Sequence, residues 1–133
     1  MVAGKAAIAD SGHPVPILHC GVGALDADST VVRFGLVGEA ERLCLREYGA
    51  VGEALCYVYS AEGRLIDHPI NARVMSAPLE AVVAAPIRVM AGGGAAKIEA
   101  LRGAARLLKP TTRVTDETTA RTLVAAEAGA KTR

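Results

Sequence analysis

The segment best suited to chemistry is a run of three glycines, 92–94, which follows a short apolar stretch and precedes a helical pattern. Glycines let backbone N–H groups approach an anion, and the N-terminus of the next helix adds about half a positive charge. Lys97 lies in the first turn of that helix, where a cation is disfavoured by roughly 0.3–1 kcal/mol, so a negatively charged ligand would explain its position. A surface lysine beside a structural glycine turn is the alternative. The segment does not match GxxxxGK[ST], because Ile98 follows the lysine, and no nucleotide–Mg²⁺ site is predicted.

A second glycine loop, 21–23, ends another apolar stretch and is followed by Asp26. Small residues such as Gly23 admit a ligand, but they also suit a tight turn. Arg33 lies in the otherwise apolar stretch 31–34, where an arginine either pairs with a carboxylate or reaches an anion such as phosphate. Glu53 begins a predicted strand and could accept hydrogen bonds from sugar hydroxyl groups. An ion pair between Arg33 and Glu53 is the simpler interpretation.

Other reactive side chains favour no catalytic or metal site. Asp67 and His68 are neighbours that point in different directions, and turn chemistry accounts for them together with Asn71. We find no Ser or Cys in a nucleophile elbow. The histidines and cysteines are too scattered for a metal or redox centre, so we expect no metal, no cofactor and buried free thiols. These residues are His13, His19, His68, Cys20, Cys44 and Cys56.

Composition narrows the class of protein. With 133 residues the chain is one domain or less, and a hydrophobic share of 51% is too high for a disordered segment. The net charge of +1, without a basic run, predicts no direct contact with nucleic acid. We see no signal peptide or apolar run long enough for a membrane, and we expect a cytoplasmic protein without membrane contact.

The hydrophobic pattern predicts an α/β fold. We expect strands over 15–20, 51–60, 64–67, 87–90 and 111–114, and helices over 38–48 and 98–108. Two more helices are predicted, one capped by Ser76 with Pro78 in its first turn and one capped by Thr115. From residue 87 onward the order is strand, helix, strand, helix, which implies parallel strands with right-handed crossovers. The prediction is a partial Rossmann-like parallel sheet with flanking helices.

Several motifs together resemble one family, the sugar-binding effector domain of SorC-type (DeoR-like) bacterial transcriptional regulators. They occur in the family's order between Gly21 and about Ala126. The matching segments are GVGALDADSTVVRFG (21–35), GAVGE (49–53), EGRLIDHPINARV (62–74), the glycines 92 and 93 with Lys97, and TDETTAR (115–121).

The resemblance implies a fold similar to the sugar isomerase and CoA-transferase folds, without their catalysis, and a phosphorylated sugar as effector. Carried over by position, Arg33 and Lys97 would hold phosphate and Glu53 would accept hydroxyl protons. Loop contacts are expected from Gly23, Asp26, Gly92 and Gly93. Glu53 replaces a frequent Asp, and Cys56 and Tyr57 stand where the family often has Gly and Arg.

The resemblance also sets the expected organisation: a loose lead-in over 1–15, the C-terminal part of the effector domain over 16–127, and a tail over 128–133. The helix-turn-helix and the first half of the effector domain are not seen in this sequence. The function expected is therefore a non-catalytic effector-domain fragment that binds a phosphorylated sugar. The alternatives are a small sugar-phosphate isomerase or lyase using Glu53 or the Asp67–His68 pair, and a truncated remnant that self-associates or pairs with an intact regulator.

Overall fold

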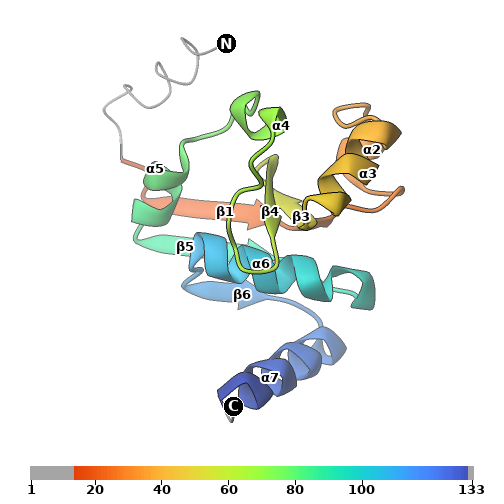
Figure 1. Cartoon of the computed structure of the whole chain (residues 1–133). Helices are drawn as coiled ribbons and strands as arrows, with labels where there is room; N and C mark the ends of the chain where they lie inside the picture. The colour runs from red at the N-terminus through yellow and green to blue at the C-terminus, as the bar shows by residue number, and fades with distance from the viewer. Residues whose placement is uncertain (1–13, 132–133) are drawn as a thin grey trace.

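A computed structural model describes the backbone of residues 14–131 and the side chains of residues 14–129 (Figure 1). Most of the predicted lead-in, 1–15, lies outside the described residues. The elements in chain order are β1 (Ile17–Gly21), β2 (Gly23–Ala24), α2 (Thr30–Arg33), α3 (Glu39–Glu47), β3 (Ala50–Ala54), β4 (Tyr57–Ser60), α4 (Pro69–Ala72), α5 (Leu79–Ala84), β5 (Ile87–Ala91), η1 (Ala95–Lys97), α6 (Ile98–Leu108), β6 (Thr112–Val114) and α7 (Glu117–Lys131).

The predicted parallel sheet is confirmed. Its strand order is β1-β5-β6, and α6 makes the crossover from β5 to β6. Parallel register places the ends of all three strands in one row, because Gly21 is opposite Ala91 and Ala91 is opposite Val114. The loops that follow these strands therefore meet at one edge of the sheet.

The chain also forms a second, antiparallel sheet of β2, β3 and β4, where the prediction had one strand over 51–60 and a returning strand over 64–67. The stretch predicted as one strand, 51–60, is a hairpin whose two turn residues, Leu55 and Cys56, have φ of 54° and 65°. Such turns usually carry Asn and Gly, so apolar residues there gave no turn signal. The predicted return strand 64–67 is reduced to a single bridge between Tyr59 and Leu65.

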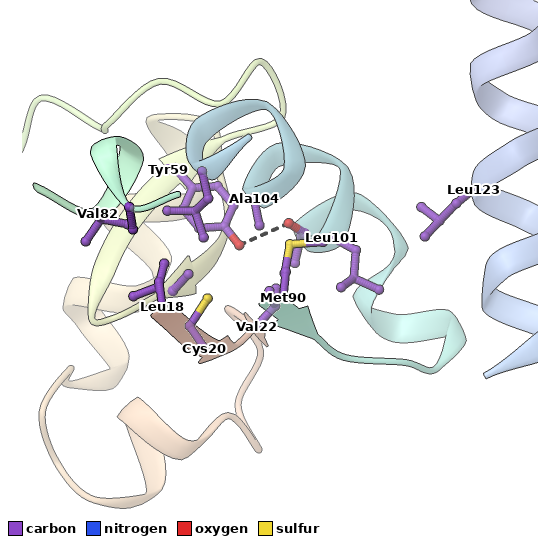
Figure 2. Close-up of a cluster of buried hydrophobic side chains, with 13 residues drawn as sticks. Leu18, Cys20, Val22, Tyr59, Val82, Met90, Leu101, Ala104 and Leu123 are labelled. Atoms are coloured by element: carbon purple, nitrogen blue, oxygen red, sulfur yellow. Dashed lines mark hydrogen bonds between the residues drawn. The ribbon is translucent and has the colours of Figure 1, made fainter. Parts of the chain in front are cut away.

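Helix α6 packs against both sheets (Figure 2). Its close approach to β3 and β4 depends on two glycines, since a Cβ on Gly52 would lie 2.5 Å from the Ala100 Cβ and one on Gly103 would lie 2.6 Å from the Ser60 carbonyl oxygen. The Tyr59 hydroxyl donates a hydrogen bond to the Ala100 carbonyl oxygen over 3.0 Å. Lys109 ends the helix in the left-handed conformation, with Pro110 after it.

Two apolar clusters form the interior. The α6 cluster joins the sheets through α6 and contains Leu18, Cys20, Val22, Ala54, Tyr59, Val82, Ala85, Met90, Ala100, Leu101, Ala104, Leu108 and Leu123. The α2–α3 cluster lies on the second sheet and contains Leu25, Val31, Val37, Leu45, Ala50, Val58, Ile66 and Ile70.

Two predicted helix caps are wrong. The helix expected after Ser76 begins at Leu79, with Pro78 as its N-cap and no side-chain cap. Asp116, rather than Thr115, caps α7, because its Oδ1 accepts a hydrogen bond from the Thr119 N–H over 2.8 Å. An aspartate is an equally good N-cap and also suits the positive end of the helix dipole.

No helix among the described residues is long and apolar enough to cross a membrane.

Candidate functional site

The candidate site lies at the edge where the three parallel strands end. The loop after β1 leads into β2, the glycine loop 92–94 follows β5, and Thr115 and Asp116 follow β6. In open α/β sheets, ligands bind beyond the carboxyl ends of the strands. The topology therefore brings both glycine loops predicted from the sequence to one place.

Glu53 reaches this edge from the second sheet. β3 pairs with β2 so that Glu53 is directly opposite Gly23, and the carboxylate occupies the space that a Cβ on Gly23 would need. The glycine is thus required by the position of the Glu53 side chain. The backbone N–H of Cys56, in the hairpin turn, donates to Oε2 of the carboxylate over 3.3 Å.

Burial raises the pKa of the Glu53 carboxyl, against the lowering effects of the Cys56 N–H and of the positive charge on Lys97. Burial also raises the pKa of the Cys20 thiol and of the Tyr59 hydroxyl, and the nearby Glu53 charge raises both further. The ion pairs among the described residues do not include Glu53. Its carboxyl is therefore a partly desolvated acceptor without a direct cationic partner.

Lys97 ends the 3₁₀ turn η1 and is half-buried. η1 contacts β2, the strand that carries Gly23 opposite Glu53, so the two predicted site residues belong to neighbouring elements. The positive charge of Lys97 lowers the pKa of the Glu53 carboxyl, against the effect of burial. Ala95 and Ala96 of the same turn line a cavity of about 350 Å³, which Asp26, Arg46 and Glu99 also line.

Arg33 does not join this pair. It lies in the last turn of the short helix α2, is exposed, and forms none of the ion pairs of the described residues. The predicted Arg33–Glu53 ion pair is absent among these residues.

The glycine loop after β5 is hydrogen-bonded to Asp116 and to Thr119, at the start of α7. Gly94 has φ of +102°, and its N–H donates to the Thr119 Oγ1 over 2.9 Å and to the Asp116 Oδ2 over 3.1 Å. Gly93 lies so close to Asp116 that a Cβ there would overlap the carboxylate. Thr119 was not singled out in the sequence, because only the fold shows that its hydroxyl lies under the loop.

Thr115 has an unusual hydroxyl group. Its Oγ1 is buried, has no hydrogen-bond partner among the described residues, and would be 3.4 Å from a Cβ on Gly93. Buried hydroxyl groups are nearly always hydrogen-bonded, so Thr115 is an exception, and its Oγ1 is closed to solvent.

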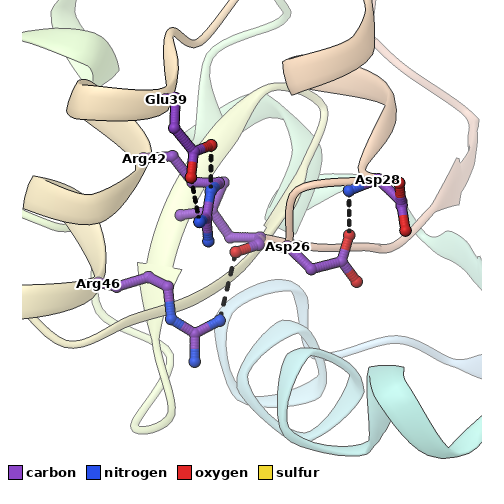
Figure 3. A network of polar contacts seen from close by, with 6 residues as sticks. Asp26, Asp28, Glu39, Arg42 and Arg46 are labelled. Carbon is purple, nitrogen blue, oxygen red and sulfur yellow. Dashed lines mark hydrogen bonds and ion pairs between the residues drawn. The ribbon is translucent and has the colours of Figure 1, made fainter.

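Asp26, a predicted loop contact, has a structural role (Figure 3). Its Oδ1 accepts a hydrogen bond from the Asp28 N–H over 3.1 Å, which fixes the turn before α2. Arg46 donates to the Leu25 carbonyl oxygen over 3.3 Å, and Arg42 is held by Glu39. A Cβ on Gly92, another predicted loop contact, would lie 3.0 Å from Cδ2 of Leu101.

The turn roles predicted for His68 and Asn71 are seen in the structure, whereas the cysteines were expected to be buried and differ in exposure. His68 Nδ1 accepts from the Ile70 N–H at the start of α4, and Asn71 bonds to the Val58 backbone, as turn chemistry predicts. The thiols are free, but only Cys20 is buried, while Cys56 is exposed in the hairpin turn. Within the described residues there is no group of three or more His, Cys, Asp or Glu that could hold a metal ion.

An apolar cavity of about 660 Å³ lies beside the hairpin turn between β3 and β4. Its lining residues come from the turn and from the segments around α2 and α4: Val31, Gly35, Leu36, Val37, Leu55, Cys56, Val58, Ile70, Arg73, Val74, Met75 and Ser76. Cys56 thus lies between this cavity and Glu53.

Sequence comparison matches residues 6–125 to a family described as "Putative sugar-binding domain". The transcriptional regulator LsrR of Klebsiella pneumoniae is 34% identical over 108 residues, which are 79% of this chain and 33% of that protein. The chain thus spans about a third of the length of this curated relative.

Solved structures agree with the match. A DeoR family transcriptional regulator from Listeria monocytogenes has a TM-score of 0.72 at 25% identity, with 78% of this chain and 42% of that chain covered. A domain of a possible sugar-binding transcriptional regulator from Arthrobacter aurescens has a TM-score of 0.70 at 26% identity, with 83% and 43% covered. The full-length sorbitol operon regulator SorC from Klebsiella pneumoniae shares the fold, with a TM-score of 0.68. This chain therefore belongs to the family of sugar-binding domains carried by SorC-type transcriptional regulators.

Proposed function

We propose that this chain binds the effector of a transcriptional regulator, a phosphorylated sugar, at the edge where β1, β5 and β6 end. The observation that carries the proposal is that η1, which ends at Lys97, lies against β2, which pairs with the strand of Glu53, and that the two side chains form no direct ion pair among the described residues. Lys97 offers a positive charge for the phosphate group. Glu53 offers carboxylate oxygens that accept hydrogen bonds from sugar hydroxyl groups.

The loop geometry supports the same assignment. The backbone of the glycine loop 92–94 lies at this edge, directly after β5. The loop is braced by Asp116 and Thr119, so these groups are held in place before a ligand arrives. Binding to a preformed site avoids the entropy cost of ordering a loop.

Arg33 is the weakest member of the predicted set. It is exposed on α2 and would have to reach the phosphate from the side of the α2–α3 cluster. We keep it in the proposal as a second phosphate contact, with a test that is separate from that of Lys97.

We propose a non-catalytic role. A raised carboxyl pKa, such as that of Glu53, is also a property of general acids and bases. If the chain were an isomerase, it would convert a phosphosugar, and Glu53→Gln would abolish the conversion. A regulator domain acts on the regulator rather than on the sugar, in the cytoplasm, with DNA contacts made by another part of the regulator.

Isothermal titration calorimetry with a panel of phosphorylated and unphosphorylated sugars tests the proposal. We expect binding of a phosphorylated sugar, no binding of its unphosphorylated form, and loss of binding in Lys97→Ala. Lys109→Asn is the matched control, because it removes a lysine at an exposed position that already has a left-handed backbone conformation. Arg33→Ala is expected to weaken binding about tenfold, which corresponds to about 1.4 kcal/mol.

The absence of binding to any phosphosugar at millimolar concentration contradicts the proposal. Equal loss of affinity in Lys97→Ala and Lys109→Asn would contradict the assigned site, since it would indicate a general charge effect.

A further inference from the structure

The apolar cavity beside the hairpin turn is separate from the proposed sugar site. Its volume of about 660 Å³ lies within the range of about 300–1,000 Å³ that is usual for small-molecule sites. Its walls come from the turn and from the segments around α2 and α4, and the described residues that line it include neither Glu53 nor Lys97. The cavity is thus a second candidate binding site of the chain.

Hydrogen bonds to the backbone hold the walls of the cavity in place. The Asn71 side chain fixes α4 to β4, because it accepts from the Val58 N–H and donates to the Val58 carbonyl oxygen, both over 2.8 Å. After α2, the N–H groups of Leu36 and Val37 both donate to the Val31 carbonyl oxygen, over 2.9 and 3.0 Å. Since both walls are fixed in this way, the cavity is preformed, and a ligand would not have to order it.

The lining of the cavity is mainly aliphatic. Val58, Ile70 and Val74 are buried in its walls. Leu36 and Met75 also line it but are 61% and 54% exposed, so they mark its opening to solvent. Aliphatic walls offer no hydrogen-bond partners to the hydroxyl groups of a sugar, whereas an apolar cavity favours an apolar molecule.

Arg73 is the one charged residue among the described residues that line the cavity. Its guanidinium group is half-exposed and pairs with Glu41, which does not itself line the cavity. A guanidinium carries five N–H donors, so others remain for a ligand. With a cation and no acid in the lining, charge complementarity favours a ligand with an anionic end, and a carboxylate matches the paired donors of arginine.

We propose that this cavity binds an aliphatic carboxylic acid of the medium-chain fatty acid type. The hydrocarbon chain lies among the aliphatic side chains of the walls, and the carboxylate lies at the opening, on Arg73. This ligand differs from a phosphorylated sugar in its apolar body, in its anionic group and in the residues that hold it.

Thiol protection in the full chain tests the proposal, with sodium decanoate as the probe. Cys56 is exposed and lines the cavity, whereas Cys44, on α3, does not line it. Maleimide labelling of each cysteine is followed by mass spectrometry as decanoate is added below the concentration at which it forms micelles. We expect labelling of Cys56 to slow about tenfold once decanoate exceeds its Kd by that factor, and labelling of Cys44 to stay unchanged. Octanoate, which is shorter by two methylene groups, should bind about fifteenfold more weakly.

Two exposed leucines provide a matched pair of variants. Leu36→Asp places a negative charge at the opening of the cavity and should weaken decanoate binding about tenfold or more. Leu43→Asp introduces the same charge at an exposed position of α3 that does not line the cavity, and should leave binding unchanged. Arg73→Met keeps an unbranched side chain without the charge. It should weaken decanoate binding about tenfold and leave the binding of decanol unchanged.

Four results would overturn the inference. Equal protection of Cys44 and Cys56 would indicate non-specific binding of the fatty acid, and no protection of Cys56 at millimolar decanoate would mean that the cavity does not bind it. Unchanged decanoate affinity in Arg73→Met would remove the reason for a carboxylate. Protection of Cys56 that grows with protein concentration in the absence of decanoate would make a second copy of the chain the occupant. No phosphosugar enters these measurements, so their outcome is independent of the sugar site.

Discussion

The two apolar clusters of this chain differ in how closely they are packed. In the α6 cluster, Gly52 and Gly103 bring the helix backbone against β3 and β4, and Tyr59 bonds to the Ala100 carbonyl oxygen. In the α2–α3 cluster, Val37 and Val58 border an apolar cavity of about 660 Å³. One cluster is a close-packed interior, and the other has side chains that lack partners on one side.

This difference bears on the candidate site. Glu53 belongs to β3 and Lys97 directly precedes α6, so both are attached to the closely packed part. Arg33 belongs to α2, which packs on the cluster beside the cavity. We infer that the relative positions of Glu53 and Lys97 are set by the fold, whereas that of Arg33 can change when the cavity is filled.

The largest effect is expected from Gly103→Val. A side chain here would lie 2.6 Å from the Ser60 carbonyl oxygen and 2.9 Å from two Tyr59 ring atoms, so α6 must move away from the second sheet. Overpacking of this kind costs about 3 kcal/mol in the free energy of unfolding. Urea unfolding followed by circular dichroism measures it.

Gly129→Ala is the matched control, because Gly129 is also helical but has no atom within 4 Å of a Cβ. It is expected to raise stability by up to about 1 kcal/mol through helix propensity. If Gly103→Val and Gly129→Ala changed the free energy of unfolding in the same direction, the close approach of α6 would not be what requires a glycine at position 103.

A paired substitution compares the clusters directly. Val82 and Val37 are almost fully buried, Val82 in the α6 cluster and Val37 at the cavity. Val82→Ala is expected to cost about 2.5 kcal/mol, the lost transfer free energy plus a new cavity. Val37→Ala should cost about 1 kcal/mol less, because its side chain already lacks contacts on one side. Equal losses in urea unfolding would mean that both clusters are packed alike.

The parallel sheet and α6 could be predicted because their signals are local. The helical spacing of Leu101 and Leu108 and the glycines after β5 are visible in the sequence. The second sheet was missed since its turn residues, Leu55 and Cys56, adopt positive φ without the usual Asn or Gly. Turn propensity is overridden there by tertiary packing and by the bond from the Cys56 N–H to Glu53.

The candidate site was predicted only as a set of separate residues. Lys97 stood out because a cation is unfavourable in a first helical turn, and Glu53 because an acid at the start of a predicted strand could accept sugar hydroxyl groups. The family resemblance then singled out both residues. That Glu53 lies against Gly23, and that Thr119 supports Gly94, depends on strand pairing and on the path of α7, which no local pattern encodes. An Arg33–Glu53 ion pair was the simpler of two interpretations, and the ion pairs of the described residues do not include it.

The smallest effect, and the one that bears most closely on the site, is the pH dependence caused by Glu53. Burial raises its pKa in the folded state, so the protein is most stable while the carboxyl is neutral and loses that contribution as pH rises through the folded pKa. Glu53→Gln keeps a neutral side chain of similar size at every pH. From pH 4 to pH 7 the unfolding free energy of Glu53→Gln should therefore rise relative to that of the wild type. If instead the difference shifts in favour of the wild type, the attraction of Lys97 outweighs burial. Glu53 would then act as an ionised partner of the lysine rather than as a free acceptor for a sugar.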